Sequence, residues 1–321
     1  NSYAQSIPDT TVNCNPGQVT LGTNIPPFVP PISTNITGDD SWGAAVPIGF
    51  TFNFFGNNYT QVVPSSNGVL TFNLASAGNF CAWSIGTTGI PNNAYHLNSI
   101  MGPWEDLYPP AGGGTATYGT IGTAPNRIFI FQLCQMPFYS CNSIRFSGQI
   151  LLYETTNVIE IHIMNKPVCS TWNSGRAIEG IQNINGTVGF AVPGRNATQW
   201  TATNDAWRFT PTSSTNYTVT PISFFPAYLS NTPAVYTWYQ LPNTTTPIQV
   251  GMPLNVNPTV TTQYMVQSNT SCLNAIFTDT ITVTVNNGLN VNANASVVGG
   301  SAGNDITICT GGVTTLNSGG G

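Results

Sequence analysis

The sequence predicts an all-β protein built from antiparallel β-sandwiches, and three observations lead to this class. Apolar residues recur at every second position over runs of strand length. No window of ten or more residues combines the apolar spacing of a helix with good helix formers. The chain also holds 32 Gly and 24 Pro, which break helices and separate the apolar runs as turn residues do.

The clearest strands lie in the middle and near the end of the chain. Residues 127–133 and 149–154 are rich in Ile, Leu and Phe, residue types that suit a half-buried pleated sheet. Residues 158–163 alternate, which places three Ile side chains on one face. Residues 280–285 alternate strictly between Thr and a β-branched apolar residue. Each run therefore predicts one strand of a sheet.

Changes of composition along the chain predict three parts. A Thr- and Ser-rich segment begins at Pro211, so we expect a first sandwich over residues 1–212. Residues 213–287 have the length of a small immunoglobulin-like sandwich, with Trp238 as its core tryptophan. Residues 288–321 hold strand patterns but are too few to close a core. We expect them to open a further module, in a longer chain or against a neighbouring subunit.

Charge is scarce, and its scarcity excludes several classes of protein. Only 5% of residues are charged, against a typical value of about 25%. Six Lys and Arg against 11 Asp and Glu cannot build the basic patch that nucleic acid requires. No run of 18 apolar residues exists, so we expect no membrane insertion. A surface kept soluble by Asn, Thr, Ser and Gln favours a secreted or cell-surface protein.

Seven cysteines fit an oxidising compartment. We expect a local disulfide between Cys134 and Cys141 across a hairpin, with Cys81 to Cys169 as the next pairing. Connectivity does not follow from the sequence, and an odd count leaves one thiol without a mate in this chain. The absence of C-x-x-C, together with only two His, argues against a zinc site.

Three aspartates are candidate ligands of a metal ion. Asp39 and Asp40 lie in a predicted turn, and Asp106 lies in a Pro-rich loop. Carboxylate oxygens are the hard ligands that Ca²⁺ takes, so calcium is the only cofactor considered. The alternative roles are a turn-forming Asx pair and a cap on backbone N–H groups.

Two pairs of titratable residues are candidate catalytic groups. Glu105 and Asp106 are adjacent, whereas a glycosidase needs two carboxyls about 5–10 Å apart with one raised pKa. Glu160 and His162 share a strand face and could transfer a proton, but no nucleophile accompanies them. We expect the second pair to be an exposed polar stripe, and we expect no enzyme activity.

Tryptophans in or beside loops are candidates for stacking on sugar rings. Trp83, Trp104 and Trp172 are the three we select, because a flat indole can cover the face of a pyranose. The alternative is that these side chains fill the sandwich core.

The first part of the chain resembles the nidogen-like extracellular domain. Residues 49–60 (G-F-T-F-N-F-F-G-N-N-Y-T), 65–72 (S-S-N-G-V-L-T-F) and 100–107 (I-M-G-P-W-E-D-L) are similar to its motifs, as is the hairpin over 149–163. Met101-Gly102 and the missing Phe before Trp104 depart from that pattern. The resemblance covers residues 40–210 and implies an antiparallel sandwich in an extracellular protein.

The remainder resembles immunoglobulin-like repeats of Bacteroidetes surface proteins exported by the type IX secretion system, among them gliding-motility adhesins. The similar segments are Y-T-W at 236–238, P-T-V-T-T-Q-Y-M-V at 258–266 and D-T-I-T-V-T-V at 279–285, with Cys272 and I-C at 308–309. The early Cys of the repeat is missing, so the resemblance leaves Cys272 without an obvious mate. In that phylum O-glycosylation favours Asp-Thr-aliphatic segments, which makes Thr280 a candidate.

These observations and resemblances predict a non-enzymatic extracellular adhesin or surface-filament protein. Its partners would be other surface proteins or copies of itself, joined through β-strand contacts. A carbohydrate-binding surface module is the first alternative, and a secreted hydrolase is the second.

Overall fold

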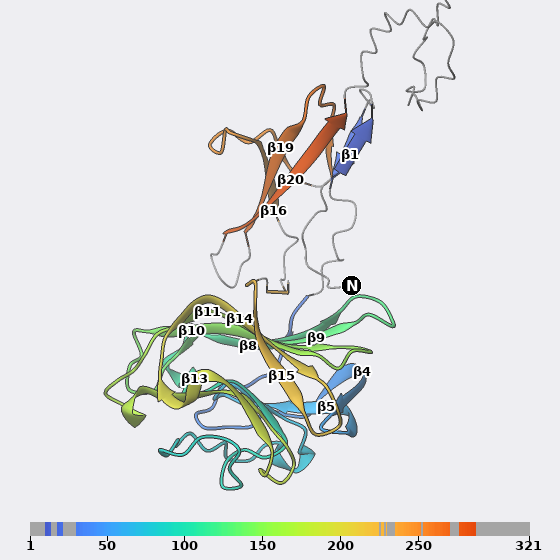
Figure 1. Cartoon of the computed structure of the whole chain (residues 1–321). Helices are drawn as coiled ribbons and strands as arrows, with labels where there is room; N and C mark the ends of the chain where they lie inside the picture. Colours follow the sequence, from blue (N-terminus) through green and yellow to red (C-terminus); the bar gives the residue numbers. More distant parts are fainter. Residues whose placement is uncertain are drawn as a thin grey trace, which may run out of the picture. The chain divides into compact units, whose positions relative to one another are not determined.

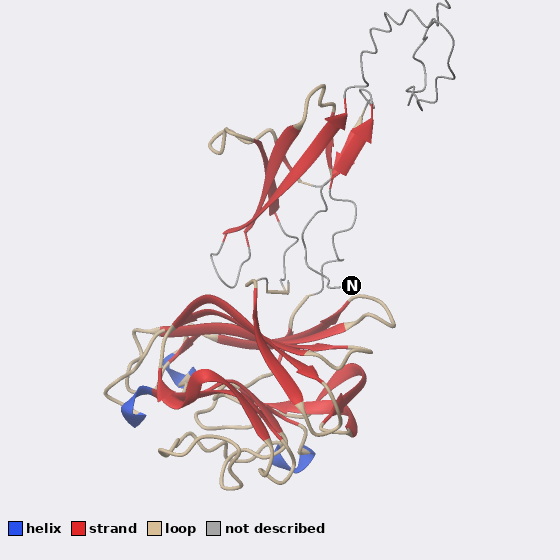
Figure 2. Cartoon of the chain, viewed as in Figure 1, coloured by secondary structure: helices blue, strands red, loops and turns tan. Residues whose placement is uncertain are grey.

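The computed structural model describes residues 10–13, 18–21, 30–224, 226–227, 229, 235–251, 253–269 and 276–286. These residues confirm the all-β class: they form four sheets, and their only helices are three short 3-10 turns (Figures 1 and 2). The chain divides into two compact units. The larger contains the described residues from 30 to 229, and the smaller contains the others.

The larger unit is a sandwich of two antiparallel sheets. One sheet has seven strands in the order β15-β14-β11-β10-β9-β8-β3. Their bounds are β3 (Ile32–Ser33), β8 (Thr115–Ile121), β9 (Ile128–Pro137), β10 (Arg145–Tyr153), β11 (Ile159–Lys166), β14 (Ala202–Pro211) and β15 (Tyr217–Ile222).

The facing sheet has six strands in the order β13-β12-β7-β6-β5-β4. Their bounds are β4 (Val46–Phe54), β5 (Asn57–Pro64), β6 (Val69–Thr71), β7 (Ser99–Trp104), β12 (Arg176–Gln182) and β13 (Gly189–Gln199). The 3-10 turns are η1 (Leu74–Ser76), η2 (Pro109–Ala111) and η3 (Asn173–Gly175).

Alternating side chains from both sheets form the core of the sandwich. Along β4 every second residue from Val46 to Phe54 is buried, as the period of a strand requires. From the other sheet, Ile159, Ile161 and Ile163 are fully buried in the same cluster. The predicted alternation of residues 158–163 is therefore confirmed on this face.

The outer face of the seven-stranded sheet is also covered, and this corrects an expectation. Glu160 and His162 are 3% and 1% exposed, so they do not form an exposed polar stripe. The chain after β15 returns over this face: Leu229 packs with Ile121, Ile128, Ile130 and Leu151. The Gln149 side chain donates to the carbonyl of Ala227 at 2.8 Å, and the Phe224 ring lies 6.0 Å from that of His162.

The smaller unit forms a five-stranded sheet and a two-stranded sheet. The order of the first is β1-β20-β19-β16-β17, with bounds Thr10–Asn13, Ile276–Asn286, Thr262–Asn269, Val235–Gln240 and Gln249–Val250. The second pairs β2 (Val19–Leu21) with β18 (Leu254–Val256). Trp238 is fully buried and its indole donates to the Gly251 carbonyl at 3.1 Å, as expected for the core tryptophan.

The units differ from the expected division at residue 212. Strand β15, beyond that boundary, pairs with β14 through a tight turn closed by Thr212 N–H donating to the Asn216 carbonyl at 2.9 Å. Strands β1 and β2 pair instead with β20 and β18 of the smaller unit. The reason is that backbone pairing crosses large sequence distances, which composition does not report. Residues 288–321 lie outside the described residues.

The disulfide pairing also differs from the expectation. Cys141 is bonded to Cys169, with their Cα atoms 5.8 Å apart. Cys134 is disulfide-bonded, but not to Cys141, and Cys81 is a buried free thiol rather than the mate of Cys169. The sandwich brings the loop after β9 against the loop after β11, and this proximity decided the pairing over the short spacing of Cys134 and Cys141.

The Cys141–Cys169 bond should contribute measurably to stability. It closes a loop with a sequence separation of 28, for which the chain-entropy model gives about 3.5 kcal/mol. We expect Cys141→Ser/Cys169→Ser to lose a similar free energy of unfolding in urea titration. Cys81→Ser should retain the Cys141–Cys169 peptide pair in a non-reducing digest. A Cys134–Cys141 pair in that digest would contradict the assignment.

Candidate functional site

A buried asparagine joins three loops at one end of the larger unit. Asn67 is fully buried in the turn between β5 and β6. Its Nδ2 donates to Asp40 Oδ1 at 2.8 Å and to the Cys81 carbonyl at 3.3 Å. Its Oδ1 accepts the Leu107 N–H at 3.1 Å, and its carbonyl accepts the Glu105 N–H at 3.3 Å. One side chain thus fixes loops that are far apart in sequence.

Gly68 explains why this turn carries the sequence Asn-Gly. Its φ is +75°, and an added Cβ would meet the Pro103 carbonyl oxygen at 2.1 Å. Only glycine therefore allows β6 to approach the end of β7 this closely. The two segments similar to nidogen motifs, around Asn67 and around Trp104, meet at this contact.

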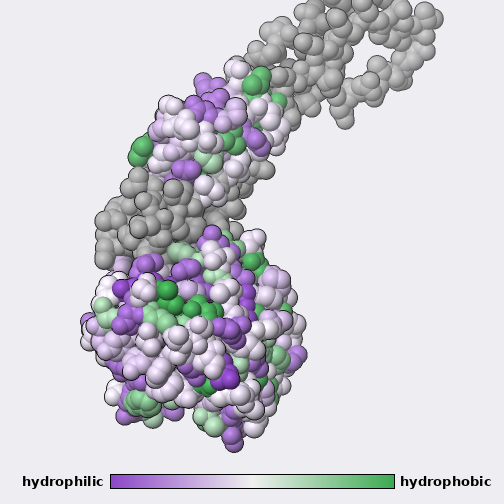
Figure 3. All heavy atoms as spheres, turned by 90° about the vertical axis from the view of Figure 1, so that its left-hand side faces the viewer, coloured by the Kyte–Doolittle hydropathy of each residue, from purple (hydrophilic) through white to green (hydrophobic). Residues whose placement is uncertain are grey.

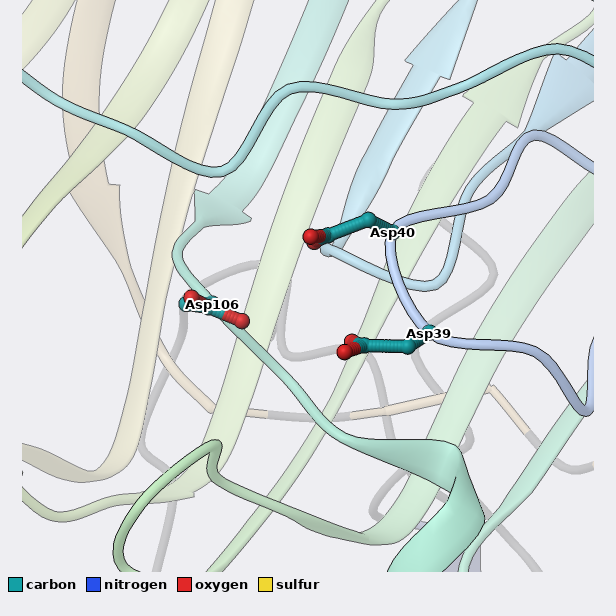
Figure 4. Close-up of side chains that lie close together, drawn as sticks. All are labelled: Asp39, Asp40 and Asp106. Atoms are coloured by element: carbon teal, nitrogen blue, oxygen red, sulfur yellow. The ribbon is translucent and has the colours of Figure 1, made fainter.

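The three predicted metal-ligand candidates lie together beside Asn67. One oxygen from each of Asp39, Asp40 and Asp106 lies within 4.8 Å of the others, and Figure 4 shows the three carboxylates turned toward one another. We call these residues the acidic cluster. Asp39 is exposed, Asp40 is half-buried in the left-handed region with φ 43°, and Asp106 is buried.

Burial and mutual repulsion set the electrostatics of the acidic cluster. Partial burial raises the pKa of Asp39, and burial together with the Asp39 charge raises the pKa of Asp40. Burial is also the main cause that raises the pKa of Asp106 to about 7, and the nearby acids Asp40, Asp39 and Glu105 add to it. A hydrogen bond from Trp172 opposes this rise.

Asp106 is held on one oxygen only. The Trp172 indole N–H donates to Asp106 Oδ2 at 2.6 Å. Its Oδ1 is buried and has no hydrogen-bond partner among the described residues. Glu105 Oε1 and Glu179 Oε1 are also buried without a hydrogen-bond partner, but those two carboxylates are in ion pairs with Lys166 and Arg195. Asp106 has no ion pair among the described residues, so the desolvation of its Oδ1 is uncompensated.

Aromatic side chains border the acidic cluster. Trp172 lies 5.1 Å from Trp83 between ring centroids, tilted by 39°, and 4.6 Å from Tyr139. Tyr139 also packs edge-on against Tyr108. We call Trp83 and Trp172 the tryptophan pair; both are half-buried and could present a face to a ligand.

Trp104 does not share this role, which corrects its selection as a stacking candidate. It is 1% exposed, its indole donates to the Ala82 carbonyl at 2.9 Å, and its ring meets those of His96 and Tyr95. Its position at the end of β7 places it inside the six-stranded sheet's own cluster, so the alternative of a core tryptophan holds.

Glu105 and Asp106 engage different partners despite being adjacent. Glu105 is 4% exposed and forms an ion pair with Lys166 at 3.0 Å. Lys166 is itself fully covered, with its ammonium 4.5 Å from the Trp200 ring centroid. Burial raises the pKa of Glu105, and the charge of Lys166 opposes that rise. A carboxyl held in this way cannot reach a substrate together with Asp106.

Glu160 and His162 belong to a buried network rather than to a proton relay at a surface. Glu160 Oε2 lies 2.9 Å from His162 Nε2 and accepts the Tyr153 hydroxyl at 2.7 Å, while Oε1 accepts Arg208 Nε at 2.8 Å. Burial raises the pKa of Glu160, but these hydrogen bonds outweigh it and lower the pKa overall. The network serves to satisfy a covered carboxylate.

Two further candidates of the sequence analysis are Cys81, which lies beside the acidic cluster, and Thr280, which lies in the smaller unit. Cys81 is buried behind Asp40, whose carbonyl accepts its N–H at 2.7 Å, and burial raises the pKa of its thiol to about 12. Thr280 is exposed on β20 of the smaller unit, where a modifying enzyme could reach it.

Sequence reasoning missed Asn67 and Tyr139 as parts of the site. The S-x-N-G segment was a signal for Asn67, but nothing local marks Tyr139.

Comparison with known proteins identifies the family. A model described as NIDO related matches residues 19–240, which is most of the chain, and the chain belongs to this family. Membership of this family suggests an extracellular-type module. No curated protein and no solved structure matches the chain. Among the described residues, no helix is long and apolar enough to cross a membrane.

Removing the Asn67 amide should destabilise the larger unit strongly. Asn67→Ala leaves the buried Leu107 N–H and the Cys81 carbonyl without this partner, so we expect a loss of about 3 kcal/mol in the free energy of unfolding. Asn73→Ala is the matched control, because Asn73 is exposed and its side chain caps only the short turn η1. Equal losses in urea titration of both variants would refute the joining role of Asn67.

Glu179 should make stability depend on pH. It is fully buried on β12 beside Arg195, and burial raises its pKa from 4.5 to about 7. The folded protein therefore holds this proton more tightly than the unfolded chain, so the free energy of unfolding falls as pH rises from about 4.5 to about 7.

We expect Glu179→Gln to reduce this fall in thermal unfolding measured from pH 3 to 8. Glu154→Gln is the control with the opposite sign: the hydrogen bond from Arg127 lowers the pKa of Glu154, so its stabilisation is present at higher pH and lost toward acid. An unchanged pH profile in Glu179→Gln would contradict the assignment.

Proposed function

We propose that this chain is a non-enzymatic extracellular adhesive or surface-filament protein. The observation that carries the proposal is the way the larger unit uses its few charges. Four of the six Lys and Arg side chains, Arg127, Lys166, Arg195 and Arg208, are in ion pairs with carboxylates of the same unit. Little cationic surface is left for a partner.

The remaining surface suits association through neutral polar and aromatic groups. On the face drawn in Figure 3, pale and hydrophilic spheres dominate the larger unit around a small hydrophobic patch. Main-chain hydrogen bonds at sheet edges and aromatic contacts supply affinity without charge. Membership of an extracellular-type family supports the same location, outside the cell or at its surface.

The smaller unit fits the part of a spacer in this proposal. Its sheets enclose Trp238 together with Ile281 and Val283, as in a small immunoglobulin-like module. We extend the proposal to an immunoglobulin-like stalk in a surface protein of the type IX secretion class. The support is the set of sequence segments that resemble those repeats. One of them, residues 279–285, contains Thr280, the candidate for O-glycosylation.

A carbohydrate-binding module is the second candidate function, and the tryptophan pair favours it. Two half-buried indoles beside three carboxylates offer a stacking surface next to hydrogen-bond acceptors. The hydrolase alternative has less support. Glu105 is in an ion pair with Lys166. Among the described residues, no two carboxyls are shown on opposite sides of a position that a substrate could occupy.

Adhesion by neutral groups should resist salt. Beads coated with the chain are counted on a surface carrying a second copy and on a glycan panel, in 0.05 M and 1 M NaCl. We expect retention on the copy-coated surface to change less than about threefold, since screening acts on charged contacts. Loss of most retention at high salt, or no retention on any surface, would overturn the proposal.

The same experiment separates the second candidate. Retention on one glycan that Trp83→Ala abolishes, while Ile184→Ala leaves it unchanged, would assign the surface to carbohydrate. Ile184 is the control because it is exposed and apolar but lies in the turn between β12 and β13, outside the tryptophan pair.

A further inference from the structure

We propose that Asp39, Asp40 and Asp106 bind one Ca²⁺ ion. This ion would bind whether the protein adheres to copies of itself or to glycans. Four observations of different kinds support it: charge, spacing, an unpartnered buried oxygen, and the hydrogen bonds that orient the carboxylates.

The acidic cluster contains the described carboxylates that have no Arg or Lys partner. The structure describes eight carboxylate side chains, and five of them are in ion pairs with Arg or Lys: Glu105, Glu154, Glu160, Glu179 and Asp205. The other three are the acidic cluster. The remaining five described carboxylates each have a cationic partner, whereas these three lie together without one. A bound cation would supply the missing positive charge.

The spacing of the oxygens matches one calcium ion. One oxygen of each aspartate lies within 4.8 Å of the others. Ca²⁺ binds oxygen at about 2.3–2.6 Å, so two oxygens on the same ion are separated by at most about 5 Å. A single ion placed among the three carboxylates of Figure 4 could therefore contact all of them.

Asp106 supplies the observation that is independent of the clustering. Its side chain belongs to a residue only 6% exposed, and its Oδ1 has no hydrogen-bond partner among the described residues. Leaving such an oxygen buried and unpaired is unfavourable, and more so when it is charged. A bound cation would satisfy this oxygen and remove the penalty.

Neutral donors hold the two inner carboxylates in place by hydrogen bonds, as the partners of metal ligands commonly do. Asn67 donates to Asp40 Oδ1 at 2.8 Å, and Trp172 donates to Asp106 Oδ2 at 2.6 Å. Each bond fixes one carboxylate oxygen and leaves the other oxygen of that group for a ligand. Neither donor carries a charge that would compete with the ion.

The ligand set favours calcium over other ions. The three groups are hard oxygen donors on two loops, and exposed Asp39 leaves one side open to water. Ca²⁺ takes six to eight oxygens in flexible geometry, including waters, whereas Mg²⁺ requires a near-ideal octahedron. Three carboxylates with an open side predict a moderate affinity, with a Kd of about 10⁻⁴ to 10⁻³ M.

The test titrates CaCl₂ alone into the chelator-treated full chain by calorimetry, with tryptophan emission as a second readout. We expect saturable binding of one ion and a change of emission, because Asp106 is bonded directly to Trp172. Thermal unfolding should shift to higher temperature, since the ion binds the folded state. No saturable heat up to 10 mM CaCl₂ would overturn the proposal.

Isosteric variants assign the heat to the acidic cluster. Asp39→Asn, Asp40→Asn and Asp106→Asn should each weaken binding at least about tenfold, because ligand charge sets affinity. Glu154→Gln is the matched control, a carboxylate paired with Arg127 outside the cluster, and should bind as the parent does.

Asp39→Asn keeps the test decisive if a buried variant fails to fold, since Asp39 is exposed. Parent-like binding by the Asp39 variant and by every folded cluster variant would place the ion elsewhere and overturn the proposal. Equal affinity for MgCl₂ would overturn the assignment to calcium.

Discussion

The hydrogen bonds of Asn67 are the constraint on which the described end of the sandwich depends. This fully buried amide bonds the loop of Asp40, the segment of Cys81 and the loop after β7 at Leu107. A buried amide is costly unless its donors and acceptor are used, and here they are. Because the partners come from separate loops, the bonds can form only when the strands are already in register. The same side chain that holds the fold therefore also positions a carboxylate of the acidic cluster.

Most charged side chains of the larger unit are paired with one another in ion pairs. Lys166 and Glu105 are both almost fully covered, and Arg195 is shared between Glu179 and Asp205. Such buried pairs need good geometry to offset the desolvation of both charges. The consequence reaches the surface: few cations remain there, and the acidic cluster is the one described group of carboxylates left without a partner charge. The proposed neutral adhesion and the proposed cation site both rest on this distribution of charge.

The outer face of the seven-stranded sheet shows what the alternation of residues along one strand can and cannot predict. Alternation in residues 158–163 correctly predicted the buried Ile face of β11, because strand geometry sends successive side chains to opposite sides. It failed for Glu160 and His162, because alternation does not report whether something covers the other side. Residues Phe224, Ala227 and Leu229, which come after β15, supply that cover. The prediction of a Cys134–Cys141 disulfide was wrong for a similar reason, since sequence spacing is not spatial distance. Cys141 is bonded to Cys169 instead.

The sequence alone determined the all-β class, the core role of Trp238 and the three aspartates worth considering, since periodicity and residue chemistry are local properties. Tertiary structure decided the rest. It placed Trp104 in the core and Trp172 at the site, brought Asp39 and Asp40 to Asp106 across more than sixty residues of chain, and paired β1 with β20. These outcomes depend on which strands become neighbours. That choice follows from the free energy of the whole core, which no short segment carries by itself.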